Sequence, residues 1–169
     1  MQWRYQLSER FRFDSKDSYG KLTNQSEAFD NRSFDLDQYA FEQKVSFQAN
    51  QHLSSALIGS YTYKINTIEA KEELNSSKLG LEMQYNKSNA AAILLQFNYI
   101  NHRYQADSDN TAVAYEMLQG LKKGGNTTWM ASIRKSLSGS LQLSINYNGR
   151  KSEDINTIHT GTVQIKAFF

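Results

Sequence analysis

The sequence contains no cysteine and no proline in 169 residues. Without cysteine, the chain can form no disulfide, no thiolate nucleophile and no cysteine metal site. The absence of proline fits a protein built mostly from hydrogen-bonded strands, because each proline removes one backbone donor from a strand ladder. No long apolar run is present and the mean hydropathy is -0.66, which excludes a transmembrane helix. Membrane-spanning strands stay possible, since their side chains alternate between apolar and polar.

A large excess of one charge is also absent. Lys and Arg number 19 against 17 Asp and Glu, and the net charge is +2. Such a balance argues against a dedicated nucleic-acid binder, and we expect no nucleic-acid partner. The patterned sequence begins directly after Met1 with no signal-peptide features, so we expect any export signal to have been removed or to lie outside this sequence. No linker or low-complexity tract divides residues 1–169, which predicts one domain.

Apolar and polar residues alternate with period two in eight segments. These segments are 3–13, 39–49, 57–65, 79–85, 93–99, 129–133, 141–147 and 159–169. In the first segment the apolar residues share one face, which only Glu9 interrupts. Such alternation is typical of strands with one apolar face, and the segments are near the length of a membrane-crossing strand, about 9 to 11 residues. The sequence therefore predicts an all-β protein with eight strands.

Short and long connections alternate between these segments. Residues 50–53, 86–89 and 137–139 form tight links, whereas residues 14–36, 66–75, 101–125 and 150–156 form long polar loops. All tight turns would then lie at one end of an antiparallel up-and-down sheet, as in outer-membrane barrels. Residues 112–119 predict a short helix within one long loop, with Thr111 at its start and Gly120 at its end. A strand extending into the loop is the alternative, since Val113, Tyr115 and Met117 also alternate.

Alternation alone does not say which face meets water, so a soluble lipocalin-like ligand-binding barrel is an alternative. The bulk of the apolar residues argues against it, because the interior of an eight-stranded barrel would be overfilled by four or five large side chains from every strand. Aromatic residues also lie toward the strand ends, where a membrane barrel has its two aromatic girdles. The girdle residues predicted here are Trp3, Phe13, Tyr39, Tyr63, Tyr85, Tyr99, Trp129, Tyr147 and Phe169.

The last strand resembles the C-terminal signature of Gram-negative outer-membrane proteins. Residues 161–169 alternate and end in Phe, with Val163, Ile165, Ala167 and Phe169 on one face. The resemblance implies insertion by the barrel-assembly machinery into the outer membrane. Residues 115–126, Trp129, 141–143, 147–153 and 159–161 resemble the C-terminal end of large outer-membrane proteins of Bacteroidota. This second resemblance implies that the chain is the C-terminal sector of a longer barrel.

The polar face of the predicted barrel carries more cations than carboxylates. The predicted lumen-lining charges are Arg4, Arg10, Arg12, Lys44, Lys64, Lys78, Arg134 and Lys166, against Asp14, Glu42 and Glu82. A small dry interior would have to bury several unpaired cations, each at a cost of several kcal/mol. We therefore expect the lumen to be wet, as in a wider barrel, or to be neutralised by a plug or an anionic group. Alternatively, several cations lie at the rims.

No motif predicts catalysis or a cofactor. His52, His102 and His159 lack the spacing of a metal site, and His159 has Ser152 nearby without a recognisable Ser-His-acid pattern. We therefore expect no enzyme activity, no metal and no cofactor. The loop cations Lys122 and Lys123, with Arg150 and Lys151, could contact lipopolysaccharide phosphates.

These patterns predict a transmembrane antiparallel barrel, either complete or the sector of a larger one. Its expected role is to form or close a barrel for transport or surface-complex assembly. Its expected partners are outer-membrane lipid including lipopolysaccharide, the barrel-assembly machinery, and other subunits or upstream strands. A complete eight-stranded anchor or surface-binding protein is the second interpretation.

Overall fold

The computed structural model describes residues 1–25, 33–68, 72–88, 90–106, 111–153 and 155–168. Within these residues the chain forms nine strands and one short helix. The elements are β1 (Gln2–Gln6), β2 (Phe11–Asn24), β3 (Phe34–Gln48), β4 (Leu53–Asn66), β5 (Glu73–Lys87), β6 (Ala91–Gln105), α1 (Ala112–Leu118), β7 (Gly124–Ser138), β8 (Leu141–Ser152) and β9 (Ile158–Ala167). The prediction of an all-β protein is therefore confirmed.

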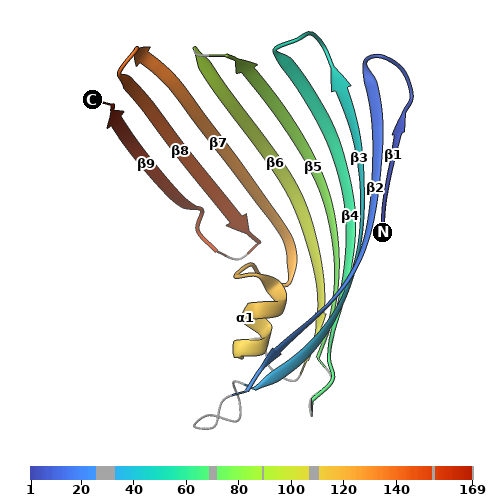
Figure 1. Cartoon of the computed structure of the whole chain (residues 1–169). Coiled ribbons are helices and arrows are strands. Elements are labelled where there is room, and N and C mark those ends of the chain that lie inside the picture. Colours follow the sequence, from blue (N-terminus) through green and yellow to red (C-terminus); the bar gives the residue numbers. More distant parts are fainter. Residues whose placement is uncertain (26–32, 69–71, 89, 107–110, 154, 169) are drawn as a thin grey trace.

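Every strand pairs with its neighbours in the chain, and all pairings are antiparallel. The result is one strongly curved, open sheet with β1 and β9 at its two edges (Figure 1). Tight turns join β1 to β2, β3 to β4, β5 to β6 and β7 to β8 at one end, and the longer links lie at the other. The predicted alternation of short and long links is confirmed.

The predicted count of eight strands is wrong, because segment 3–13 is a hairpin and not one strand. β1 and β2 pair with Tyr5 opposite Phe13, so positions of equal parity face each other and the alternation continues unbroken across the turn. The turn is held by Ser8, whose Oγ accepts the backbone N–H groups of Arg10 and Phe11 at 3.4 and 3.2 Å. Glu9, the one interruption of the apolar face, marks this turn.

The predicted long loop 14–36 is also wrong for most of its length. β2 continues to Asn24 and β3 begins at Phe34, with a continuous register from Asp14 opposite Lys44 to Asn24 opposite Phe34. The links between strands are 25–33, 67–72, 106–123 and 153–157. Each is shorter than the loop predicted there, and 153–157 also extends one residue beyond the predicted end at 156. Polar residues pair as well as apolar ones here, because the ladder uses backbone groups alone.

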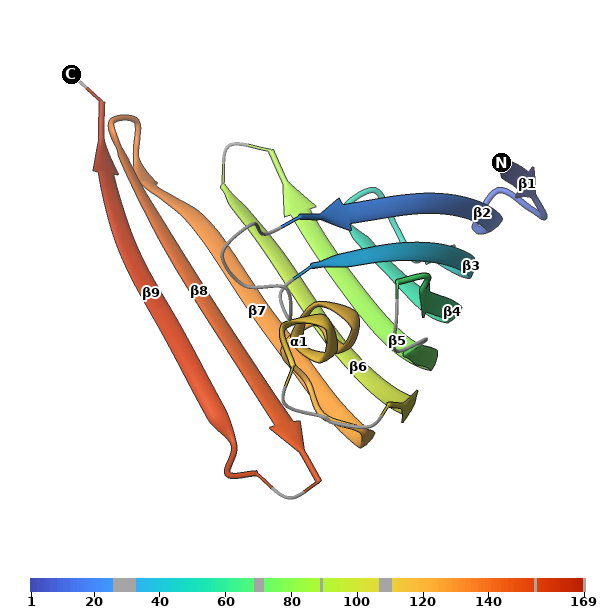
Figure 2. The same cartoon turned by 90° about the horizontal axis from the view of Figure 1, so that it is seen from below.

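The short helix predicted at 112–119 is confirmed as α1. Thr111 Oγ1 accepts the N–H of Ala114 at 2.9 Å, and the helix ends at Gln119 and Gly120, whose φ values are 54° and 70°. The helix lies inside the curve of the sheet, as Figure 2 shows from below. The described residues contain no helix with the length and hydropathy needed to span a bilayer.

The hydrophobic core lies between α1 and the concave face of the sheet, near the long links. Its buried members are Phe34, Leu36, Leu74, Tyr104, Val113, Ala114, Met117 and Leu118. The sequence did not reveal this docking, because residues that pack on α1 come from three different strands. The loop between β6 and β7 therefore folds inward onto the sheet.

Candidate functional site

The two faces of the sheet are distinguished by residue parity. Each strand pairing joins odd positions to odd and even positions to even, apart from the irregularity at Ser136 and Ser138. The strand residues buried against α1, such as Leu36, Leu74 and Tyr104, are even-numbered. Even-numbered strand residues therefore face the concave side and odd-numbered ones the convex side.

The convex side carries a continuous belt of exposed apolar side chains, which we call the apolar band. The band consists of Trp3, Tyr5, Phe11, Phe13, Tyr39, Phe41, Val45, Phe47, Leu57, Tyr61, Leu79, Leu81, Met83, Tyr85, Ile93, Leu95, Phe97, Tyr99, Trp129, Ala131, Ile133, Leu143, Ile145, Tyr147, Val163 and Ile165. Many of these side chains are extensively exposed, for example Leu81 at 58% and Val163 at 68%. An exposed apolar surface of this extent marks an interaction with a partner or a membrane.

Tyrosines line the boundary of the band on the side of the long links. The Tyr19 and Tyr39 rings lie 4.8 Å apart, and Tyr19 donates its hydroxyl to Asp37 at 2.9 Å. Tyr61 donates in the same way to Asn75. Both hydroxyls are thus directed away from the band and toward polar residues. This amphipathic placement is typical of tyrosines at a membrane interface.

The predicted girdle residues all occupy odd positions on the convex side, except that Phe169 lies outside the described residues. Tyr39, Tyr63 and Tyr99 lie toward the long links, and Tyr85 lies toward the tight turns. Of the predicted C-terminal signal, Val163, Ile165 and Ala167 also occupy odd positions of β9.

Beyond the band, the strands continue toward the long links in what we call the extension. It comprises residues 18–24, 34–38, 64–66, 73–76, 101–105, 124–126 and 150–152. Here most convex residues are polar, including Lys21, Asp35, Glu73 and Arg103, and the exceptions are Tyr19 and Ile65. Lys21 pairs with Asp35 at 2.8 Å, and this hydrogen bond lowers the pKa of the Asp35 carboxyl. The concave side of the extension carries the buried core under α1. The apolar side chains therefore lie mainly on the convex side in the band and on the concave side in the extension, an arrangement we call the inversion of polarity.

On the concave side of the band, most of the predicted lumen charges form ion pairs. Arg4 and Arg12 both bind Asp14 at 2.8 Å. Lys44 binds Glu82 at 2.9 Å, and Gln96 donates to the second oxygen of the same carboxylate at 2.9 Å. The remaining pair joins Lys78 to Glu42 at 3.6 Å. All three predicted carboxylates on this side thus have cationic partners, and the excess of cations over carboxylates stays as the sequence predicts.

Lys64 has no carboxylate partner among the described residues and is instead hydrogen-bonded to the C-terminal end of α1. Its Nζ donates to the backbone oxygens of Met117 at 3.1 Å and Glu116 at 3.5 Å, and the residue is buried. A cation is favourable here because the last carbonyls of a helix lack partners within the helix. Within the described ranges, Arg10, Arg134 and Lys166 form no ion pair, although Lys166 lies 5.2 Å from the Phe168 ring.

His102 lies in the extension under α1 and is buried. Neither of its ring nitrogens has a hydrogen-bond partner among the described residues. Burial and the nearby charge of Lys64 lower the pKa of His102 to about 4. The imidazole is therefore neutral at physiological pH.

Asn126 fixes the segment between α1 and β7. Its side-chain oxygen accepts the Lys122 N–H at 3.2 Å and the Ser152 hydroxyl at 2.6 Å. Its amide group donates to the backbone oxygens of Lys122 at 2.7 Å and Gly124 at 3.0 Å. One buried amide thus joins this segment to β8, a role that the sequence did not signal.

The residues considered for a Ser-His-acid group are not brought together. Ser152 occupies the concave side and donates to Asn126, whereas His159 occupies the convex side. Nδ1 of His159 lies 2.7 Å from the Tyr147 hydroxyl, and its ring stacks on Tyr147. No three His, Asp or Glu side chains of the described chain form a metal-binding group.

No protein-family model matches this chain, and no curated protein matches it either. The resemblance to outer-membrane proteins of Bacteroidota therefore stays a prediction from the sequence.

Proposed function

We propose that this chain forms nine neighbouring strands in the wall of an outer-membrane β-barrel that supports transport or the assembly of a surface complex. The observation that carries the proposal is the inversion of polarity between the apolar band and the extension. A sheet surrounded by water alone would keep its apolar residues on one face from end to end. Here the apolar residues of the band need a nonpolar environment outside the sheet, and the extension needs water outside it.

The dimensions of the band fit this placement. On β3 the band runs from Tyr39 to Phe47, close to the about 9 to 11 residues with which a tilted strand crosses a membrane. The tyrosines at its boundary direct hydroxyls into the extension, as an interface with water favours. The lipocalin-like alternative needs apolar residues on the concave side of the band, where the ion pairs lie instead.

The two edges of the sheet support a barrel with additional strands. β1 and β9 each pair with one neighbour within the described residues, and both are exposed along their whole length. A free edge in a membrane would leave backbone groups unsatisfied. Upstream strands of the same protein or strands of another subunit would satisfy them. The alternating apolar face of β9 also fits its predicted role as the signal for the barrel-assembly machinery.

Single-cysteine variants test the membrane placement, because the chain has no native cysteine. Spin labels would be attached at Leu81→Cys on the convex band, Asn75→Cys on the convex extension, and Gln84→Cys on the concave band. After reconstitution into liposomes, we expect the Leu81→Cys label to be accessible to oxygen and protected from a water-soluble nickel relaxant. The labels at 75 and 84 should show the reverse. Equal nickel accessibility at 75 and 81 would overturn the proposal.

The concave ion pairs of Asp14, Glu42 and Glu82 also suit the second interpretation, a complete small barrel acting as an anchor, because a narrow interior favours charges that are paired. A gel-shift assay on the 169-residue chain in detergent distinguishes the two. Closed barrels resist SDS until heated, so a heat-dependent shift would show closure by this chain alone and favour the anchor. Migration that does not change with heating would favour a sector that needs further strands.

A further inference from the structure

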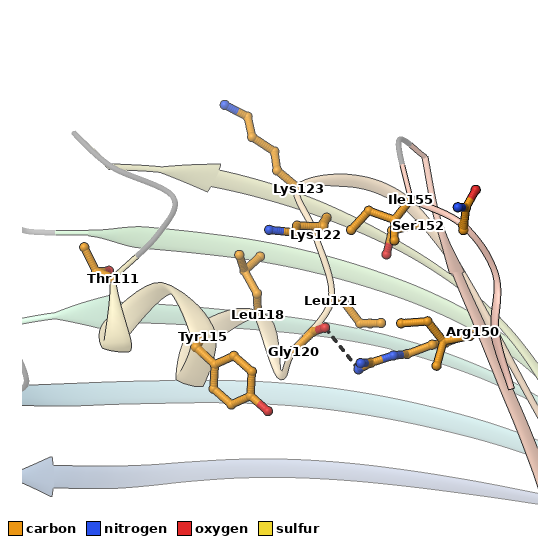
Figure 3. A pocket seen from close by; sticks show the side chains of 12 residues that line it. Thr111, Tyr115, Leu118, Gly120, Leu121, Lys122, Lys123, Arg150, Ser152 and Ile155 are labelled. Carbon is orange, nitrogen blue, oxygen red and sulfur yellow. Dashed lines mark hydrogen bonds between the residues drawn. The ribbon is translucent and has the colours of Figure 1, made fainter. Parts of the chain in front are cut away.

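A pocket of about 810 Å³ lies between α1 and the β8–β9 end of the sheet, within the extension. Its walls come from three parts of the chain: the helix with Thr111, the segment from Gly120 to Lys123, and residues within and beside the β8–β9 link. Figure 3 shows the side chains that line it. Nothing in the proposed barrel role uses this pocket.

The described lining has one sign of charge. Lys122, Lys123 and Arg150 contribute to it, and no carboxylate does. Two described acidic residues adjoin the lining in the sequence: Glu153, whose carboxylate accepts the Gly125 N–H at 3.3 Å, and Glu116, whose charge interacts with Lys64. A concave site with several cations and no acid concentrates anions.

Arg150 is held in position to face the pocket. Its Nη1 donates to the backbone oxygen of Gly120 at 3.2 Å, which leaves the other guanidinium donors free of that bond (Figure 3). A Cβ added to Gly120 would lie 3.3 Å from this Nη1 and 3.5 Å from the Tyr115 hydroxyl oxygen. The two polar groups therefore lie close together beside Gly120. A fixed guanidinium is well suited to bind phosphate oxygens in pairs.

Another part of the lining is apolar or aromatic, beside the polar residues Thr111, Ser152 and Asn156. Leu118, Leu121, Ile155 and Ile158 contribute to the lining, and Tyr115 is 71% exposed. An exposed tyrosine ring offers a flat surface for the C–H face of a sugar, and sites for small molecules combine such walls with a few polar groups. The pocket therefore has one part suited to an anionic group and another suited to a ring.

We propose that this pocket binds a phosphorylated sugar, with Arg150 at the phosphate and Tyr115 against the sugar ring. Lys122 and Lys123 both extend away from Arg150 in Figure 3, so they add positive charge to other parts of the lining. The same chemistry is offered by a free sugar phosphate and by the phosphorylated headgroup of a lipopolysaccharide. The inference goes beyond the barrel proposal, since the pocket is formed by this chain alone.

Calorimetric titration of the full chain in detergent micelles tests the proposal. The probes are glucose 6-phosphate, glucose and inorganic phosphate. We expect glucose 6-phosphate to bind at least about tenfold more tightly than glucose, because the phosphate contacts are charge-assisted. Tyr115→Leu should weaken glucose 6-phosphate and leave inorganic phosphate unchanged. Equal binding of glucose and its phosphate, or no binding of either, would overturn the proposal.

Arg150→Gln and Lys151→Gln form a matched pair of variants. Both remove one exposed positive charge, but Lys151 lies at an odd position and does not line the pocket. We expect Arg150→Gln to weaken glucose 6-phosphate at least about fivefold and Lys151→Gln to change it less than twofold. Equal losses in the two variants would indicate only a general charge effect and would contradict the site.

A further arm distinguishes the two sources of the ligand. Lipopolysaccharide from which the acyl chains have been removed would be titrated before and after phosphatase treatment. Tighter binding than glucose 6-phosphate, lost after dephosphorylation, would assign the pocket to the lipid headgroup, whereas weaker binding would assign it to a free sugar phosphate. Since micelles suffice for these titrations, failure of the pocket and failure of the membrane placement are separate results.

Discussion

The indole ring of Trp129 lies across Gly149, its register partner on the neighbouring strand, and occupies the space that a Cβ at position 149 would need. The ring continues toward His159 on the next strand, with the two ring centres 5.9 Å apart. Glycine at 149 therefore allows an aromatic side chain to lie flat along the outer surface of three strands. This arrangement resembles the covering of strand glycines by aromatic neighbours in other sheets.

Replacing Gly149 tests this relationship. Gly149→Ala should displace the Trp129 ring and lower the free energy of unfolding by about 1–3 kcal/mol, because the added methyl group overpacks the contact. Urea titration of the refolded chain in micelles, followed by tryptophan emission, measures both effects. Gly59→Ala is the matched control, since Gly59 is also a strand glycine on the convex side and a Cβ there would contact nothing within 4 Å. A similar loss in both variants would contradict the packing role of Gly149.

The Glu82 carboxylate joins three strands and should contribute more to stability than the Glu42 carboxylate. Glu82 bonds Lys44 from β3 and Gln96 from β6, and its side chain is 18% exposed. Glu82→Gln leaves the Lys44 charge uncompensated in a half-buried site, so we expect a loss of about 1–3 kcal/mol. Glu42→Gln breaks a longer and more exposed pair, and its loss should be below about 1 kcal/mol. Urea midpoints measure the difference, and equal losses would refute this ranking.

His102 should make the stability depend on pH between its two pKa values. An unfolded histidine titrates near 6.5, whereas the buried ring titrates at about 4. Between these values the unfolded state binds more protons, so the free energy of unfolding should fall as pH decreases from 6.5 to 4. Above 6.5 and below 4 this residue should contribute no further change.

His102→Leu should remove this part of the pH dependence. Because neither ring nitrogen has a partner in the described structure, we expect the variant to be at least as stable as the parent at pH 7. Chemical unfolding at half-unit pH intervals gives the comparison, and an unchanged slope in His102→Leu would show that another group titrates.

Much of the fold follows from the sequence because strand alternation and turn spacing are local signals. The apolar face of each predicted segment could be assigned from period two alone, and α1 could be placed from Thr111 and Gly120. The hairpin at Ser8 was not predicted, because odd positions face the same side before and after the turn and the apolar–polar alternation continues through it. The extension of β2 to Asn24 was not predicted either, because its polar residues form a strand ladder without any apolar alternation.

The candidate site was less predictable because it depends on how α1 docks. Nothing near residue 112 shows that the helix turns inward and accepts hydrogen bonds from Lys64, which lies 53 residues before Met117. The cation excess on even positions was visible in the sequence. The pairing of Lys44 with Glu82 was not, since it joins strands that are not adjacent and depends on side-chain reach across the curved sheet.

Each strand of this sheet pairs only with strands that adjoin it in the chain, which affects both the assembly and the evolution of the sheet. Each new strand closes only the loop that separates it from the previous one, so ordering the nine strands requires no pairing between segments distant in the chain. The chain can thus be ordered one hairpin after another. By the same reasoning, duplicating or deleting a whole hairpin at β1 or β9 would widen or narrow the sheet without changing the register of the other strand pairs. Genetic change can therefore add or remove strands of such a sheet two at a time.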